Sequence, residues 1–154
     1  MKNQRLLILI PATIAGILLG LYRFSAEMKR QKEETRSELE ELVERLQSDL
    51  PVVKEYKNSI ITQTGLMIRN DSLITTYQLE AADSILVGFR EGRLASYLRE
   101  EGLQGLLSDY KSYRLTHLAC DLGMVFSEQI YDKDGGPVYF WEYSPDDYRP
   151  LLKK

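Results

Sequence analysis

The chain has 154 residues, with 20 Lys and Arg, 23 Asp and Glu, and a single Cys. This length leaves room for one small domain after an N-terminal segment. All 23 acidic residues but only 17 of the basic ones follow position 25, so that part has a formal charge of −6, which argues against nucleic acid as a partner. A lone Cys excludes an intramolecular disulfide.

The stretch Leu6–Tyr22 contains no charged residue. A helix of this length spans roughly 25 Å, near the lower limit for crossing a bilayer core. Lys2 and Arg5 precede it, as in export signals, but no small-x-small cleavage site follows it. We therefore predict that residues 1–25 form an uncleaved signal anchor, a single transmembrane helix.

The orientation of this anchor is less tightly constrained. Counting basic residues on both sides slightly favours a cytoplasmic C-terminal part, because more of them follow the span than precede it. A short basic tail before an apolar run is nevertheless the usual export signal. We predict a single-pass protein of the bacterial inner membrane whose C-terminal domain is periplasmic or otherwise extracytoplasmic.

Residues 26–50 are rich in strong helix formers and contain neither Gly nor Pro. Opposite charges lie four positions apart, as in Arg30 and Glu34, and an apolar stripe begins at Leu39. The stripe is too short for an independent coiled coil. We predict a charged helical stalk that Pro51 ends and whose far end packs onto the domain.

From Ile60 to Glu80 the pattern changes to a period of two, which predicts two strands joined by a turn at Asn70-Asp71. Pairing Arg69 with Ser72 sets the register, which then pairs Thr62 with Leu79. The expected core face carries Ile60, Leu66, Ile68, Leu73, Tyr77 and Leu79.

The middle of the chain predicts helices. Asp83 or Ser84 can cap the first, Gly102 is expected to break it, and Gly123 is expected to close the second.

A second hairpin is predicted around Asp134-Gly135, with Tyr131 paired with Val138. Its expected inward face carries Met124, Phe126, Ile130, Tyr139, Trp141 and Tyr143, and its outward face carries Val125, Tyr131, Val138 and Phe140.

These elements predict an α+β fold. Residues 51–144 form the domain, an antiparallel four-stranded sheet of two hairpins packed against a broken helix or helix pair. Residues 145–154 form a turn-like tail on the surface.

The order of these motifs resembles a group of small bacterial envelope proteins of unknown function, over roughly residues 50–144. The matching positions are Tyr77, Cys120, Tyr131, Asp132, Asp134 and Gly135. The resemblance implies an exported α+β domain and brings no catalytic residues with it.

Two groups of residues are candidates for chemistry. His117 and Cys120 lie three apart on a helix and could form a base and nucleophile oriented by Asp121, although a buried apolar Cys beside a partly exposed His is the more common arrangement. The loop from Asp132 to Pro137 lacks the later ligands that calcium needs, so a plain turn is favoured. We expect no metal, no cofactor and no catalytic residue.

The outward residues of the second hairpin are the candidates for partner binding, because an exposed apolar patch on a small domain usually marks an interface. The tail, the stalk or a second subunit could equally cover them. The sequence therefore favours a non-enzymatic, membrane-anchored interaction module that binds a protein partner or itself through its sheet. The alternatives are a small-ligand carrier and an envelope enzyme that uses Cys120 and His117.

Overall fold

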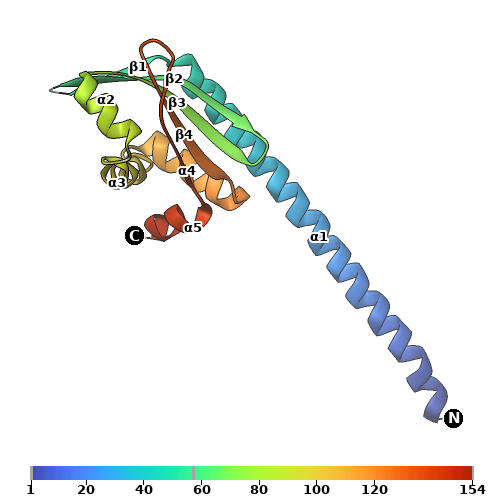
Figure 1. Ribbon diagram of the computed structural model, residues 1–154. Helices are drawn as coiled ribbons and strands as arrows, with labels where there is room; N and C mark the ends of the chain where they lie inside the picture. The colour runs from blue at the N-terminus through green and yellow to red at the C-terminus, as the bar shows by residue number, and fades with distance from the viewer. Residues whose placement is uncertain (1, 57, 154) are drawn as a thin grey trace. The chain divides into compact units, whose positions relative to one another are not determined.

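The computed structural model describes the backbone of residues 2–56 and 58–153, and the side chains of these residues except those of 2–16, 56, 95–98 and 153 (Figure 1). The chain divides into two compact units, Met1–Thr35 and Arg36–Lys154. Helix α1 runs from Lys2 to Ser48 and contributes residues to both units.

The first unit is helical throughout its described residues. The predicted membrane span begins in residues whose side chains lie outside the described part; from Ile17 to Phe24 its apolar side chains are exposed. Within the part of the chain that the structure describes, no helix combines the length and the hydrophobicity needed to cross a bilayer. The predicted pair of Arg30 and Glu34 is confirmed, with Nε and Oε1 3.5 Å apart.

The second unit contains a five-stranded sheet in the order β1-β2-β3-β4-β5. Its strands are β1 (Val52–Tyr56), β2 (Ser59–Arg69), β3 (Ser72–Ala81), β4 (Val125–Asp132) and β5 (Pro137–Tyr143). The helices are α2 (Asp83–Arg90), α3 (Ala95–Gly105), α4 (Tyr110–Leu122) and α5 (Pro145–Tyr148), followed by a 3-10 turn, η1 (Arg149–Lys153). The α+β class predicted from the sequence is confirmed.

The predicted antiparallel, four-stranded sheet is wrong in two respects. First, β3 and β4 pair in parallel, so the two hairpins join into one mixed sheet. The connection through α2, α3 and α4 is long enough for the chain to return and start β4 in the direction of β3, which a short turn cannot do. Second, β1 adds a strand at the edge. Its residues from Val52 to Glu55 are exposed, so no buried face marked it in the sequence.

The β2–β3 hairpin follows the predicted register near its turn, where Arg69 pairs with Ser72. The predicted pair of Thr62 with Leu79 is wrong, because a β-bulge between Gln63 and Gly65 shifts the pairing by one residue. Leu79 pairs with Ile61 instead. Ile61 consequently packs with the core in the place that the sequence assigned to Ile60.

The β4–β5 hairpin has a similar irregularity. Ile130 pairs with Tyr139, but Tyr131 pairs with Pro137, so Val138 is an extra residue in β5 and the predicted pairing of Tyr131 with Val138 is wrong. A bulge changes the face of the sheet to which a side chain of the bulged strand points. Val138 is accordingly only 5% exposed and packs with Leu79 and Phe89, which corrects its expected outward orientation.

The helical segment breaks at a different place from the one predicted. Gly102 lies inside α3, whereas the chain leaves the helical conformation near Gly92, where φ is +71°. Gly123 closes α4 in the left-handed conformation, as predicted. No side chain caps α2, for which Ala82 is the N-cap residue. Asp109 caps α4 by accepting a hydrogen bond from the Ser112 N–H at 2.9 Å.

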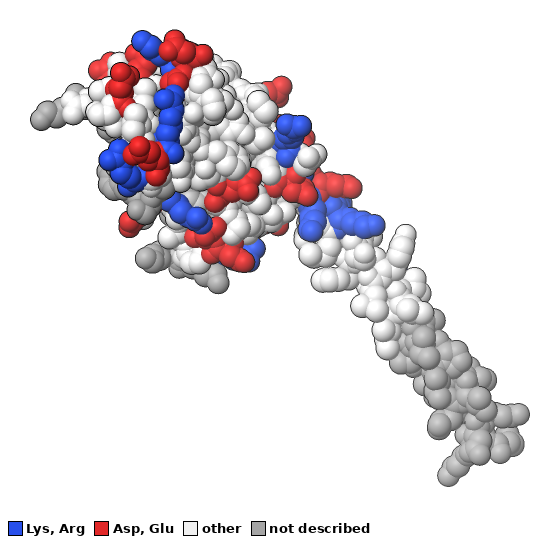
Figure 2. Space-filling view, in the orientation of Figure 1, with Lys and Arg blue, Asp and Glu red and all other residues white. Residues whose placement is uncertain are grey.

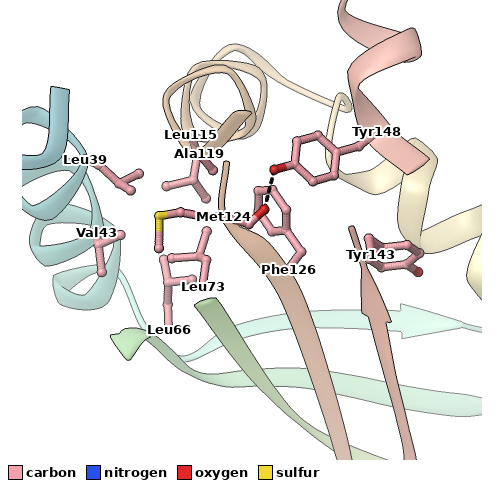
Figure 3. Packing of buried hydrophobic residues seen from close by; sticks show 10 residues of the cluster. All are labelled: Leu39, Val43, Leu66, Leu73, Leu115, Ala119, Met124, Phe126, Tyr143 and Tyr148. Atoms are coloured by element: carbon pink, nitrogen blue, oxygen red, sulfur yellow. Dashed lines mark hydrogen bonds between the residues drawn. The ribbon is translucent and has the colours of Figure 1, made fainter. Parts of the chain in front are cut away.

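The hydrophobic core lies between the sheet and the helices and forms two clusters. The larger cluster contains Leu39, Val43, Leu66, Leu73, Leu115, Ala119, Met124, Phe126, Tyr143 and Tyr148 (Figure 3). The smaller contains Leu79, Phe89, Ile130 and Val138. The end of α1 packs into the core, as expected of the stalk. The expected surface tail instead buries Tyr148, whose hydroxyl donates to the Met124 carbonyl.

Leu39 is fully buried, although it lies in a helix that is mostly exposed upstream. We predict that Leu39→Ala lowers the free energy of unfolding of the second unit by about 3 kcal/mol, the cost of a large cavity in a core. Met28→Ala, at an exposed position of the same helix, is the matched control and should change it by less than about 0.5 kcal/mol. Denaturant unfolding of the full chain in mild detergent measures both. Equal effects would mean that α1 does not pack as described.

Candidate functional site

The sheet has two different faces. The helices α2 and α4 and the end of α1 contribute their buried residues to clusters on one face, and α2, α3 and α4 gather on one side of the sheet in Figure 1. The residues that alternate with the core positions point to the opposite face, which we call the outer face. It comprises Val53, Glu55, Ile60, Thr62, Gly65, Met67, Arg69, Ser72, Ile74, Thr76, Gln78, Glu80, Val125, Ser127, Gln129, Tyr131, Phe140 and Glu142.

The charges of the outer face lie at its periphery. Its charged members, Glu55, Arg69, Glu80 and Glu142, lie on the edge strands β1 and β5 or at the ends of β2 and β3. Its exposed apolar side chains are Phe140 and Val53, each 54% exposed, and Met67, 46% exposed. Thr, Ser and Gln side chains lie between them. Exposed aromatic and Met side chains are enriched at the centre of protein interfaces, and charged residues are typical of the rim.

The four predicted partner-binding residues are not equivalent. Phe140 is exposed, Val125 and Tyr131 are half-buried, and Val138 belongs to the core. The Tyr131 hydroxyl donates to Gln129 Oε1 at 3.1 Å. A shallow depression of about 240 Å³ is lined by Tyr131, Pro137, Phe140 and their neighbours. Whether these residues bind a partner stays a prediction.

The surface charges of the second unit are mixed. On the side drawn in Figure 2, Lys and Arg side chains alternate with Asp and Glu side chains, and neither sign forms a broad patch. Several oppositely charged pairs join different elements, among them Arg90 with Asp132 at 2.7 Å and Arg114 with Glu38.

A buried carboxyl group is the most unusual feature of the inner face, and the sequence analysis missed it. Glu128 is 7% exposed and lies on β4 between the core positions Phe126 and Ile130. The sequence does contain the information: Glu128 is two residues from both Phe126 and Ile130, so strand alternation places it on the same inward face. Such a group needs compensation, because burying a charge without a partner is costly.

The groups around Glu128 are hydroxyls and an indole. The Tyr77 hydroxyl lies 3.5 Å from Oε1, and the Tyr143 hydroxyl lies 3.5 Å from Oε2. The Trp141 Nε1 is buried and makes no well-formed hydrogen bond within the described residues, yet its N–H dipole stabilises the carboxylate electrostatically. Among the described residues, no cationic side chain forms a salt bridge with Glu128.

Burial raises the pKa of Glu128 to about 7, and the Trp141, Tyr143 and Tyr77 groups lower it only in part. Burial also raises the pKa of Tyr143, and the neighbouring Glu128 charge adds to that shift. Glu128 is therefore largely protonated in acid and titrates near neutral pH in the folded protein.

His117 and Cys120, the candidate base and nucleophile, have different neighbours. The His117 Nδ1 lies 3.5 Å from Asp121 Oδ2, and the His117 ring contacts Tyr113. Cys120 instead packs against the larger core cluster and interacts electrostatically with Arg149 and Tyr148.

The Asp132 loop is a turn stabilised by its own side chain. Asp132 Oδ1 accepts hydrogen bonds from the backbone N–H groups of Asp134 at 3.0 Å and Gly136 at 2.7 Å, and Oδ2 pairs with Arg90. These bonds occupy the carboxylate that a cation would need. Among the described residues, no group of three or more His, Cys, Asp and Glu side chains could hold a metal ion.

Comparison with known proteins identifies the fold. No family model matches the chain, and no curated protein matches it. Among solved structures, a candidate secreted protein from Pseudomonas aeruginosa is similar with a TM-score of 0.55 and 15% identity, over 77% of this chain and 96% of that one. The type II secretion system pilotin AspS from Vibrio cholerae is similar with a TM-score of 0.50 and 8% identity, over 78% of this chain and 97% of that one. At these identities the likeness shows a shared fold.

The raised pKa of Glu128 gives a prediction with a definite sign. Its folded pKa of about 7 exceeds the ordinary 4.5, so its contribution to stability is complete below pH 4.5 and is lost as the pH rises through 7. The free energy of unfolding of Glu128→Gln minus that of the native protein should therefore rise by roughly 3 kcal/mol between pH 4 and pH 8. Denaturant unfolding at both pH values measures this gain.

The control is Glu142→Gln, which removes an exposed carboxylate from the outer face of the same sheet. Its stability difference from the native protein should stay nearly constant with pH. A constant difference for Glu128→Gln as well would show that Glu128 is ionised in the folded protein and would contradict the assignment.

Proposed function

We propose that the chain is a non-catalytic interaction module of the bacterial cell envelope, which binds a protein partner through the outer face of its sheet. The observation that carries this proposal is the composition of that face: Phe140, Met67 and Val53 are exposed, and the charged residues lie on edge strands or at strand ends. Such an apolar face is expensive to leave in water and is typical of a surface that a partner covers.

The shared fold supports a place in the envelope. One similar structure is a pilotin of a type II secretion system, and the other is a candidate secreted protein. We further propose that the stretch Leu6–Tyr22 anchors the chain in the inner membrane with the folded unit outside the cytoplasm. The exposed apolar side chains from Ile17 to Phe24 favour this anchor, because they would lose contact with water in a bilayer.

The two alternatives have less support. A catalytic pair would need His117 and Cys120 in contact, but His117 turns to Asp121 and Tyr113. A small-ligand carrier would need a deep cavity, whereas the two depressions described, of about 240 and 270 Å³, lie at the surface.

Substitution of Phe140 tests the binding face. We expect Phe140→Ser to weaken association with the partner at least tenfold, because an aromatic anchor at the centre of an interface is a typical hot spot. Stability should change by less than about 0.5 kcal/mol, since the side chain is exposed. In-cell crosslinking from position 140 captures the partner, which is then identified. The affinity of that partner for the purified full chain, with and without Phe140→Ser, is the measurement.

The matched control is Tyr110→Ser, which removes a 76% exposed aromatic side chain from α4. It should leave association unchanged. Equal loss for both variants would point to nonspecific adhesion, and a crosslinked second copy of this chain would make the partner the protein itself. Unchanged affinity in Phe140→Ser would contradict the proposed face.

Topology needs its own test. Alkaline phosphatase fused after Lys154 should be active in cells, because it folds only outside the cytoplasm, and a green fluorescent protein fused at the same place should not fluoresce after Sec-dependent export. The reverse pattern would overturn the exported orientation, and fractionation of the fusion into the soluble phase would overturn the anchor.

A further inference from the structure

The hydroxyl of Tyr143 stands between α3 and Glu128. Its oxygen lies 3.1 Å from the Arg99 carbonyl oxygen of α3 and 3.5 Å from Glu128 Oε2. The ring is fully buried, so water does not supply further partners. A phenol has one proton to donate, and it can make only one strong hydrogen bond at a time to these two acceptors.

The backbone of α3 lies directly against these polar atoms. A Cβ atom at Gly102 would lie 2.2 Å from the Tyr143 hydroxyl and 3.0 Å from Glu128 Oε2. Only a residue without a side chain permits this approach. Gly102 is therefore the residue through which α3 contacts the sheet at this point. A change in the hydrogen bond between Tyr143 and Glu128 acts directly on α3.

The hydrogen bonds of the pair depend on the charge of Glu128. When the carboxyl group is protonated, it can donate to the Tyr143 oxygen while the phenol donates to the Arg99 carbonyl, and both acceptors are satisfied. When it is ionised, the carboxylate is the stronger acceptor and attracts the phenol proton. The Arg99 carbonyl then loses its bond to the sheet.

We propose that Glu128 is a proton-controlled latch for α3, which the Tyr143 hydroxyl holds on the sheet while Glu128 is protonated and releases when Glu128 ionises. This device goes beyond the binding of a partner on the outer face, and it does not depend on it. The pKa of Glu128, raised by burial to about 7, places the release near neutral pH.

The other charged and titratable groups near the latch do not replace Glu128. On β3 the Tyr77 hydroxyl faces the carboxylate, and on β5 so do the Trp141 indole and Tyr143 itself. The Arg99 guanidinium of α3 lies over the Tyr143 ring, 5.8 Å from its centroid, and pairs with Asp147 at 2.9 Å.

Two nearby elements also carry charges. On α2, Arg90 pairs with Asp132, and on α5, Asp147 accepts hydrogen bonds from the Ser144 N–H and hydroxyl. These hydrogen bonds lower the pKa of Asp147, so it stays charged throughout the neutral range. Glu128 is thus the group of this cluster whose charge changes near pH 7.

Tryptophan fluorescence tests the first half of the proposal, because Trp141 is the single Trp of the chain and lies beside Glu128. The emission of the full chain in detergent should change in one transition with a midpoint near pH 7. Glu128→Gln should abolish that transition. His117→Gln replaces the single His of the chain, which lies outside this cluster, and should leave the midpoint in place. A transition that persists in Glu128→Gln or disappears in His117→Gln overturns the proposal.

Hydrogen exchange tests the second half. Between pH 5.5 and pH 8.5, the protection of the α3 amides, corrected for intrinsic exchange, should fall about tenfold in the native chain, as for the loss of one hydrogen bond to a stronger competitor. The α4 amides are the internal reference and should not change. In Tyr143→Phe, the α3 amides should be weakly protected at both pH values while the Trp141 transition remains. Unchanged α3 protection across the Trp141 transition of the native chain would refute the latch.

Discussion

The parallel pairing of β3 with β4 is the constraint on which the rest of the fold depends. It joins two hairpins into a single sheet and requires the chain between them to return over a long helical connection. Because the apolar residues of α2 and α4 pack on the same face of that sheet, the core is confined to one side. The outer face is the consequence, a sheet surface to which these helices contribute no buried residue.

The same pairing explains why the core is divided. It aligns Thr75 of β3 with Glu128 of β4, and the hairpin then aligns Glu128 with Trp141 of β5. This row carries polar groups across the middle of the inner face, between the cluster around Phe126 and the cluster around Ile130. The seam has a cost in stability that an apolar row would not have, and α3 lies over it with Gly102 in contact. The least apolar part of the core is thus also the place where a helix can separate from the sheet.

The sequence predicted what local patterns encode and missed what tertiary pairing decides. The turns at Asn70 and Gly135, the closure of α4 at Gly123 and the inward face of β4 followed from residue type and periodicity. The parallel pairing and the edge strand β1 did not, because neither leaves a local signature. The two bulges also shift by one residue the positions that alternation assigns, which is how Val138 reached the core and Ile61 replaced Ile60.

The candidate site could be predicted only in part for the same reason. Phe140 kept its expected exposure because it lies beyond the bulge, in regular register with Gln129. Glu128 was visible in the pattern, but its significance depends on the hydroxyls of Tyr77 and Tyr143, which come from other strands. The pilotin and the candidate secreted protein share this fold at 8% and 15% identity, so the shared backbone does not specify the side chains on either face. What distinguishes this chain therefore lies in its own residues: an outer face with exposed apolar side chains that can bind a partner, and a buried carboxyl group beneath α3 that responds to protons.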